Sequence, residues 1–471
     1  MALRDLTLPT YATDPAMPTA VDDTGTSAVT PDGGSADIAV DVDAVAVVGV
    51  PGGEVPLCPT RVEAGALMAA DVDVIEAIKA RIFDLDCSEI RITANDPWDA
   101  RPYNTFIKVG IRYYEVSSEI HIADEEQMHR IVAHFFLPNT SNGDLEGAQA
   151  SLVTRGTFAY KEGVEERSGR IEVFYPPVMD ALSVNMQLTS KHEMDLEDFV
   201  KSDACTLNIA AFIKLATMAG ASILISGETD AGKTTLLSAC LQEVPNVDPT
   251  GETPASTLDP EMVVVIQEFD EIPMRKMLYK QKFYSFEAAA RTLGIERSAS
   301  GMGAPGGTSD LVDIIKVVRG DRVVIGECRG GEMYDYLEAA SIYSGSMTTL
   351  HAKSPQQAIS NAVQFAMRNP NAAVAGLAGV RSLVAGGVDL VVHMAKINGR
   401  RVVAEIVELD GSMADDGAPR SSRLFVFNAS TGSWDRPEGS GLSERPGRLL
   451  AKLTQAGLPN LHANPITEGA A

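Results

Sequence analysis

Residues 223–237 place a glycine-rich turn between an apolar run and a helix-forming run, and few folds accommodate that combination. An apolar run leads into GETDAGKTT, which matches the pattern GxxxxGK[ST] from Gly227 to Thr234. A turn of this kind, after a buried strand and at the start of a helix, directs backbone N–H groups toward a bound phosphate. The segment therefore predicts an α/β domain that binds a nucleoside triphosphate.

The residue types in the turn have separate predicted roles. Gly227 and Gly232 let the backbone curve around phosphate oxygens, and Lys233 reaches the β and γ phosphates. The Thr234 hydroxyl is the expected metal ligand, so ATP and Mg²⁺ are the predicted cofactors. The complete predicted nucleotide-binding set is Gly227, Glu228, Thr229, Asp230, Ala231, Gly232, Lys233, Thr234 and Thr235.

From residue 223 onward, short β-branched runs alternate with helical patterns. The runs that follow the first one lie at residues 262–267, 322–326, 346–350 and 388–394. The clearest helix start is Ser354, with Pro355 as the first helical residue. Strands that alternate with helices predict a parallel sheet covered on both faces.

An antiparallel addition to this sheet is predicted near residue 400. Asn398 and Gly399 separate two apolar runs, and this pair suits the two positive-φ positions of a type I′ turn. A further strand at 424–427 and a basic helix at 446–456 complete the chain.

The first part of the chain has a different pattern. From residue 1 to about 59 it is acidic, with Arg4 as its only basic residue, which predicts a disordered tail or, alternatively, a docking segment for a partner. A mixed α+β pattern follows, with an amphipathic helix through Val72, Ile75, Ile78 and Ile82, strands at 89–93, 105–109, near 158 and at 171–174, and a helix at 125–136.

Residues 189–204 are polar and charged, typical of a linker or a surface helix. We therefore predict five segments. The segments are a disordered acidic tail (1–60), a smaller α+β domain (61–190), a linker (191–204), a P-loop domain (205–410), and a C-terminal strand, loop and helix (411–471).

Composition excludes some classes of function. A formal net charge of −25 disfavours general nucleic-acid binding, since neutralising a phosphate backbone requires clustered Lys and Arg. The five cysteines include no CxxC pair, so neither a disulfide framework nor a zinc site is expected, and a reducing cytoplasm fits best. No apolar run is long enough to predict a transmembrane segment.

Two later segments add candidate catalytic residues. DRVVIGECRGGE ends its apolar run at Glu327, where a carboxylate beside the phosphate-binding turn can hold the water shell of Mg²⁺ or polarise the attacking water. GSMTTLHAKS places His351 near the same edge of the sheet, where an imidazole can sense the γ-phosphate. The glycine-rich residues 300–309 follow no strand, so we expect a surface loop and no second nucleotide site.

Four motifs in this order resemble those of the type II/type IV secretion-system ATPases, most closely the CpaF/TadA-type ATPases of Tad (Flp) pilus assembly. They are GETDAGKTTLL as Walker A, VVVIQEFDEI as the Asp box, DLVDIIKVVRGDRVVIGECRGGE as the Walker B region and GSMTTLHAKSP as the His box. The segments SGRIEVFYPPV and PGRLLAKLTQAGL add weaker similarity.

The resemblance implies a RecA-like ATPase domain preceded by a sensor-like domain, in a homo-hexameric ring. Such a ring hydrolyses ATP to drive an inner-membrane platform protein of a pilus or secretion system, and it is cytoplasmic, at the inner face of the cytoplasmic membrane through partners. Arg170 and Arg319 are the implied arginine fingers, with Arg329 behind them.

The chain departs from the family pattern at the Asp box. Gln267 and Glu268 stand where the family presents Glu-Asp, so either Gln267 orients water by hydrogen bonding or Glu268 replaces the carboxylate. A basic residue expected at 184–187 is also missing. Two alternative functions therefore stay open: a nucleotide-binding regulatory or scaffold ring with weak hydrolysis, and a RecA-like nucleic-acid motor.

Overall fold

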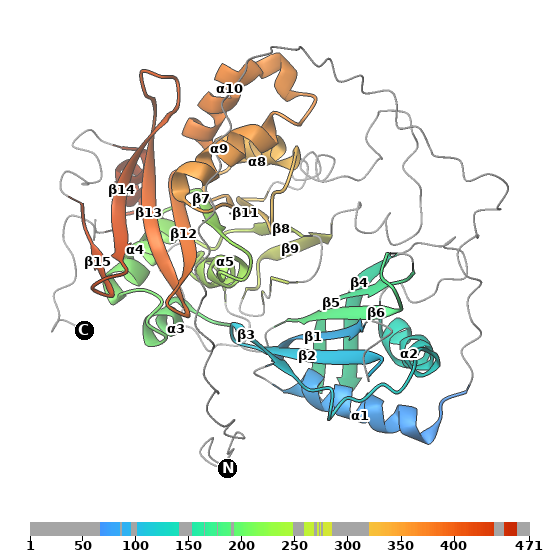
Figure 1. Ribbon diagram of the computed structural model, residues 1–471. Helices are drawn as coiled ribbons and strands as arrows, with labels where there is room; N and C mark the ends of the chain where they lie inside the picture. Colours follow the sequence, from blue (N-terminus) through green and yellow to red (C-terminus); the bar gives the residue numbers. More distant parts are fainter. Residues whose placement is uncertain are drawn as a thin grey trace, which may run out of the picture. The chain divides into compact units, whose positions relative to one another are not determined.

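The protein forms two β-sheets, each covered by helices (Figure 1). The structure is a computed structural model, and it describes residues 66–84, 87–95, 101–140, 153–163, 165–176, 178–189, 193–247, 259–267, 271–272, 274, 277–284, 320–437 and 447–458. The predicted tail (1–60) and the glycine-rich residues 300–309 lie outside these residues.

The first sheet has six antiparallel strands in the order β3-β2-β1-β6-β5-β4. Their bounds are β1 Cys87–Ala94, β2 Tyr103–Val109, β3 Arg112–Glu115, β4 Val153–Glu162, β5 Glu165–Phe174 and β6 Ser183–Leu188. The sequence indicated four of these strands and missed β3 and β6. All four residues of β3 are exposed, so this edge strand lacks the alternation that identifies a half-buried strand.

Helices α1 (Ala69–Phe83) and α2 (Glu125–Ile131) cover this sheet, and α2 continues as a π-helical turn, Val132–Phe136, and a 3₁₀ turn, Leu137–Asn139. Ile75, Ile78 and Ile82 of α1 are buried as predicted, whereas Val72 is exposed. Its neighbour Asp71 is buried instead, and the Asp71 carboxylate pairs with Arg130 of α2 at 2.8 Å. The two helices are thus joined by a salt bridge as well as by apolar packing.

The second sheet has nine strands in the order β15-β14-β13-β12-β7-β11-β10-β8-β9. Their bounds are β7 Ile223–Gly227, β8 Val263–Gln267, β9 Lys280–Tyr284, β10 Arg322–Ile325, β11 Met347–His351, β12 Leu390–Ile397, β13 Arg400–Met413, β14 Pro419–Asn428 and β15 Ser433–Asp435. The six strands from β12 to β9 are parallel, which confirms the predicted parallel sheet.

Helices cover both faces of the parallel strands, as the alternating pattern predicts (Figure 1). One face packs against α3 (Leu196–Lys201), α4 (Leu207–Met218), α5 (Lys233–Gln242) and α11 (Arg448–Gln455). The other packs against α8 (Glu332–Ile342), α9 (Pro355–Ala366) and α10 (Ala372–Gly387). Helix α9 begins at Pro355 with Ser354 as its N-cap, as expected.

The predicted linker and one predicted boundary coincide with regular structure. Helix α3 lies in the predicted linker, and its Leu196 and Phe199 are buried in the same core as α4. Strand β13 continues across residue 410, so the C-terminal strands extend the nine-stranded sheet.

The hairpin of β12 and β13 has the predicted two-residue turn. Asn398 and Gly399 have φ values of 51° and 77°, and the residues on either side of them are paired. Both values lie in the left-handed region that a type I′ turn requires. The predicted strand and helix after it are present as β14 and α11.

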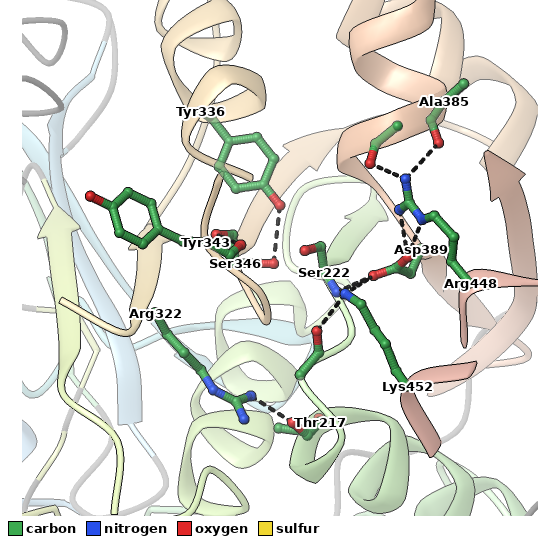
Figure 2. A network of polar contacts seen from close by, with 12 residues as sticks. Thr217, Ser222, Arg322, Tyr336, Tyr343, Ser346, Ala385, Asp389, Arg448 and Lys452 are labelled. Atoms are coloured by element: carbon green, nitrogen blue, oxygen red, sulfur yellow. Dashed lines mark hydrogen bonds and ion pairs between the residues drawn. The ribbon is translucent and has the colours of Figure 1, made fainter. Parts of the chain in front are cut away.

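Buried charges gather at the amino ends of the parallel strands (Figure 2). Asp389, just before β12, is fully buried; it accepts hydrogen bonds from Ser222 N at 2.7 Å, Arg448 Nε at 2.9 Å and Lys452 Nζ at 2.7 Å. Arg448 and Lys452 belong to α11. We call Ser222, Asp389, Arg448 and Lys452 the amino-end network; it attaches the last helix to the sheet.

Arg322 forms a second buried contact at this end of the sheet. Its side chain is fully buried at the start of β10 and binds Glu261 Oε1 at 2.8 Å. It also donates to the Thr217 carbonyl at 2.5 Å (Figure 2). The Thr217 carbonyl, in the last turn of α4, also accepts a hydrogen bond from Gly220 N at 3.0 Å, so the arginine is an additional donor to it.

Two further observations concern the described residues as a whole. None of their helices combines the length and the apolarity needed to cross a bilayer. Their four cysteines, Cys87, Cys205, Cys240 and Cys328, are buried free thiols.

Candidate functional site

The phosphate-binding turn lies at the carboxyl end of β7, the middle strand of the nine-stranded sheet. Strand β7 ends at Gly227 and α5 begins at Lys233, with Gly232 at its N-cap in the left-handed region (φ 93°). A Cβ atom on Gly227 would lie 2.4 Å from the Met394 carbonyl oxygen of β12, so only glycine fits there. Asp230 also has a positive φ, 63°. The turn therefore has the backbone form that the motif predicts.

Lys233 is buried, and its ammonium has two contacts inside the site. Its Nζ donates to the Glu228 carbonyl at 3.0 Å and lies 3.2 Å from His351 Nδ1. Burial lowers the pKa of Lys233 to about 8, although the charge of Glu327 opposes that shift. The side chain therefore remains mainly charged at neutral pH, as an ammonium that binds phosphate must.

Glu327 and His351 meet beside Lys233, as the sequence predicts. Strand register pairs His351 with Gly227, and the imidazole Nε2 lies 2.9 Å from Glu327 Oε1. Glu327 Oε2 pairs with Arg329 Nη2 at 2.6 Å. Burial opposes ionisation of Glu327, but contacts with His351 and Arg329 outweigh it and lower the pKa of this carboxyl to about 2. The carboxylate is thus ionised throughout the physiological range.

The backbone around Glu327 is fixed by neighbouring strands. Gly326 N donates to the Ile266 carbonyl at 2.8 Å, and Thr349 Oγ1 donates to the Gly326 carbonyl at 2.8 Å. Cys328 N donates to the Thr349 carbonyl at 2.9 Å. These bonds hold the segment that carries the carboxylate between β8 and β11.

Sequence reasoning missed two cations that contact the phosphate-binding turn. Arg401 of β13 donates from Nε to the Asp230 carbonyl at 2.7 Å, and Lys396 Nζ of β12 lies 3.5 Å from the Asp230 carboxylate. Both lie in the β12–β13 hairpin, which the Asn398-Gly399 pair predicted. The sequence offered no sign that this hairpin reaches the phosphate-binding turn. They add positive charge beside a site for an anionic ligand.

Gln267 ends β8 and is buried. Its Oε1 accepts hydrogen bonds from Glu271 N at 3.2 Å and Ile272 N at 3.0 Å, so this oxygen orders the backbone after the strand. The proposed role of Gln267 in orienting water stays a prediction. Glu268, its alternative, lies outside the described residues.

The three candidate arginine fingers have different positions. Arg329 contacts Glu327 of its own chain. Arg170 lies in β5 and pairs with Glu172 at 2.8 Å, and its role as a finger stays a prediction. Arg319 lies outside the described residues.

Part of the chain is similar in sequence to proteins of bacterial secretion and conjugal transfer systems. The type IV secretion system protein PtlH of Bordetella pertussis is 29% identical over 205 residues, which cover 42% of this chain and 53% of the relative. The conjugal transfer protein TrbB of Rhizobium radiobacter is 24% identical over 249 residues (51% and 65%). The type IV secretion system protein VirB11 of Bartonella quintana is 24% identical over 270 residues (57% and 64%). The chain thus spans about half the length of PtlH.

Solved structures with a partial likeness include the VirB11 ATPase of the Brucella suis type IV secretion system, with a TM-score of 0.34 and 21% identity over 73% of this chain and 98% of that one. The pilus retraction motor PilT with bound ADP has a TM-score of 0.46 and 15% identity, over 72% and 81%. The chain matches no family model. In sequence, about half of it is similar to proteins of type IV secretion and conjugal transfer systems.

Proposed function

We propose that this chain is an ATP hydrolase that drives a pilus or secretion system. The observation that carries the proposal is the contact of Lys233 with His351, and of His351 with Glu327. Three separate strand ends bring these side chains together beside the phosphate-binding turn. A buried ammonium next to a fixed carboxylate is the arrangement that binding and cleaving a triphosphate requires.

The residues present fit ATP and Mg²⁺. Gly227 and Gly232 keep side chains away from the turn, and the ten-residue helix α5 directs its first N–H groups at it. Mg²⁺ would be held by the Thr234 hydroxyl, phosphate oxygens and water. Bound there, Mg²⁺ would neutralise charge on the phosphates.

The low pKa of Glu327 supports a role as a hydrogen-bond acceptor. A carboxylate with a pKa of about 2 is a weak base at neutral pH, so it orients the attacking water as an acceptor and does not remove its proton. A proton on His351 Nε2 satisfies both contacts of the ring, with Nε2 donating to Glu327 and Nδ1 accepting from Lys233. His351 thereby links the phosphate-binding lysine to the water-orienting carboxylate.

The proposal extends to a homo-hexameric ring of RecA-like domains, closest to the CpaF/TadA-type subgroup, that acts on an inner-membrane platform protein. The order of the four motifs supports this subgroup, and the similarity to PtlH and VirB11 supports a secretion system. In such a ring, Arg170 and Arg319 supply positive charge to the phosphates of a neighbouring site.

Lys233→Ala and Glu327→Gln test the proposal in a phosphate-release assay. We expect each to lower turnover about a hundredfold or more, because each removes a group that contacts the reacting phosphate or water. Lys233→Ala also abolishes ATP binding, whereas Glu327→Gln retains it. Lys214→Ala and Glu338→Gln, which change the same residue types elsewhere, are the controls. Phosphate release by both site variants at the wild-type rate would overturn the proposal.

A second candidate is a nucleotide-binding regulatory or scaffold ring with weak hydrolysis. It is favoured by Gln267, whose Oε1 is taken by two backbone N–H groups where the resembled family has a glutamate. Tight ATP binding with negligible phosphate release, even when membranes containing the platform protein are added, would select this candidate over the first.

A further inference from the structure

Arg401 reaches the phosphate-binding turn from a strand that is distant from it in sequence. Met394 of β12 pairs with Gly227, the last residue of β7, and β12 continues to Ile397 before the chain returns along β13. The end of this hairpin therefore extends beyond the carboxyl end of β7, where the turn begins. Arg401 lies in that extension, in register with Lys396.

The side chain of Arg401 contacts the turn at two residues. Its Nε donates a hydrogen bond to the Asp230 carbonyl at 2.7 Å. Its aliphatic part lies against the start of α5, since a Cβ atom on Gly232 would be 3.5 Å from Arg401 Cδ. Asp230 has a φ of 63°, in the left-handed region that residues other than glycine adopt only where surrounding contacts support it. The bond from Arg401 is such a contact.

This bond also determines where the next N–H group points. In a planar trans peptide, the C=O and N–H bonds point in opposite directions. Because the Asp230 carbonyl is held toward Arg401, the N–H of Ala231 is directed away from that side chain. Ala231 N donates to the Glu228 carbonyl oxygen at 3.3 Å, and Lys233 Nζ donates to the same oxygen at 3.0 Å. The N–H group and the phosphate-binding ammonium thus converge on one point.

We propose that Arg401 is a positioning residue: by holding the Asp230 carbonyl, it directs the Ala231 N–H toward the phosphates of a bound nucleotide. This inference rests on the proposed function. Backbone N–H groups of such a turn surround the α and β phosphates, so the contact is common to ATP, ADP and inorganic pyrophosphate. A contact made equally before and during the reaction contributes to binding and not to the chemical step.

Two substitutions of similar length isolate the hydrogen bond. A glutamine places its amide nitrogen where arginine has Nε, whereas a methionine places a methyl group there, and both lack the positive charge. We expect Arg401→Met to raise the Kd for ATP and for ADP about tenfold, while kcat at saturating ATP stays within about threefold of wild type. Arg401→Gln should keep both Kd values within about threefold of wild type, because a donor remains at that position.

Arg400→Met is the matched control for the loss of charge. Arg400 precedes Arg401 in β13, so its side chain points to the opposite face of the sheet, and its Nη2 lies 3.3 Å from the Asp203 carboxylate. This variant should bind ATP as wild type does. An equal rise in Kd for Arg400→Met and Arg401→Met would overturn the inference, because lost charge would then be the cause. Equal Kd values for Arg401→Gln and Arg401→Met would overturn it as well, whether raised or unchanged.

Inorganic pyrophosphate tests the same bond without a nucleoside. Its affinity is measured by displacement of a labelled ATP analogue from the full-length protein, and Arg401→Met should weaken it by the same factor as ADP, about tenfold. A loss for ADP alone would mean that Arg401 contacts the base or ribose, and it would contradict the inference. If wild type binds ATP without releasing phosphate, the proposed ATP hydrolase fails and the binding data still decide the inference. If wild type binds neither ATP nor pyrophosphate, both fail.

Discussion

The two ends of the parallel strands both hold buried charges, but they use them differently. At the amino end, Asp389 is fully buried and has two cations and a backbone N–H as partners. At the carboxyl end, Lys233 is buried with a carbonyl and an imidazole as partners, and Glu327 and His351 keep 25% and 45% of their side chains exposed. The amino end pairs its charged groups within the protein, whereas the carboxyl end leaves Glu327 and His351 partly exposed to solvent.

This difference distinguishes charges that stabilise the fold from charges that bind a ligand. A buried charge that the protein pairs completely holds elements together, and removing one partner leaves the other uncompensated. A cation whose pKa burial lowers, as for Lys233, gains from an added anion. The degree of pairing, more than the presence of a charge, therefore indicates where a ligand binds.

Asp389→Ala should have the largest effect. It leaves Arg448 and Lys452 without their carboxylate, so we expect a loss of about 3 kcal/mol in the free energy of unfolding. ATP affinity should stay near wild type, because the amino-end network lies at the opposite end of β7. Urea unfolding followed by circular dichroism measures the first quantity, and nucleotide titration the second. Asp415→Ala, an exposed acid, is the control; equal stability of the two variants would remove the proposed distinction.

The carboxyl end should respond to pH through Lys233. Its pKa of about 8 lies below the ordinary value because of burial, so the neutral amine predominates as pH rises above 8. With a pKa near 8, about a tenth of the lysine is charged at pH 9, and ATP affinity should fall by about tenfold from pH 7. Fluorescence titration with a labelled ATP analogue measures this loss. Lys233→Arg, which keeps its charge, should show a flat profile; the same decline in that variant would place the titrating group elsewhere.

The smallest expected effect concerns acid stability at Glu327. Its folded-state pKa is lowered from 4.5 to about 2, so its pairing stabilises the fold above pH 4.5 and is lost as pH falls toward 2. Because the carboxylate and Arg329 are partly exposed, this contribution should be about 1 kcal/mol or less. Wild type should thus lose slightly more stability than Glu327→Gln between pH 5 and pH 2.5 in urea titrations. If the free energy of unfolding fell equally with pH in both proteins, the pairing of Glu327 would have no influence on stability.

Local patterns predicted the parts of the fold that local physics determines. The turn at Asn398 and Gly399 requires positive φ at both residues, and few other pairs accept it. The start of α9 follows from a capping serine and a proline in the first turn. The approach of Glu327 and His351 was also predicted, since carboxyl ends of parallel strands share one edge of the sheet.

Contacts between distant residues could not be predicted from one sequence. Arg401 and Asp230 are 171 positions apart, and their hydrogen bond depends on the neighbouring positions of β12 and β7 and on the register of the hairpin. The same holds for His393 and Ser226, 167 positions apart. The strand β15 escaped prediction for another reason, because three residues are too few to show any period.

The buried thiols have a practical consequence for spectroscopy. Burial raises the pKa of Cys205 and of Cys240 to about 12, and it raises the pKa of Cys328 well above its ordinary value, so alkylating reagents at neutral pH find almost no thiolate at these positions. Once Cys58 is replaced, a cysteine introduced at Val374, which is 95% exposed in α10, becomes the favoured target for a dye. The described fold thereby supplies a nearly silent background for fluorescence measurements of nucleotide-driven motion.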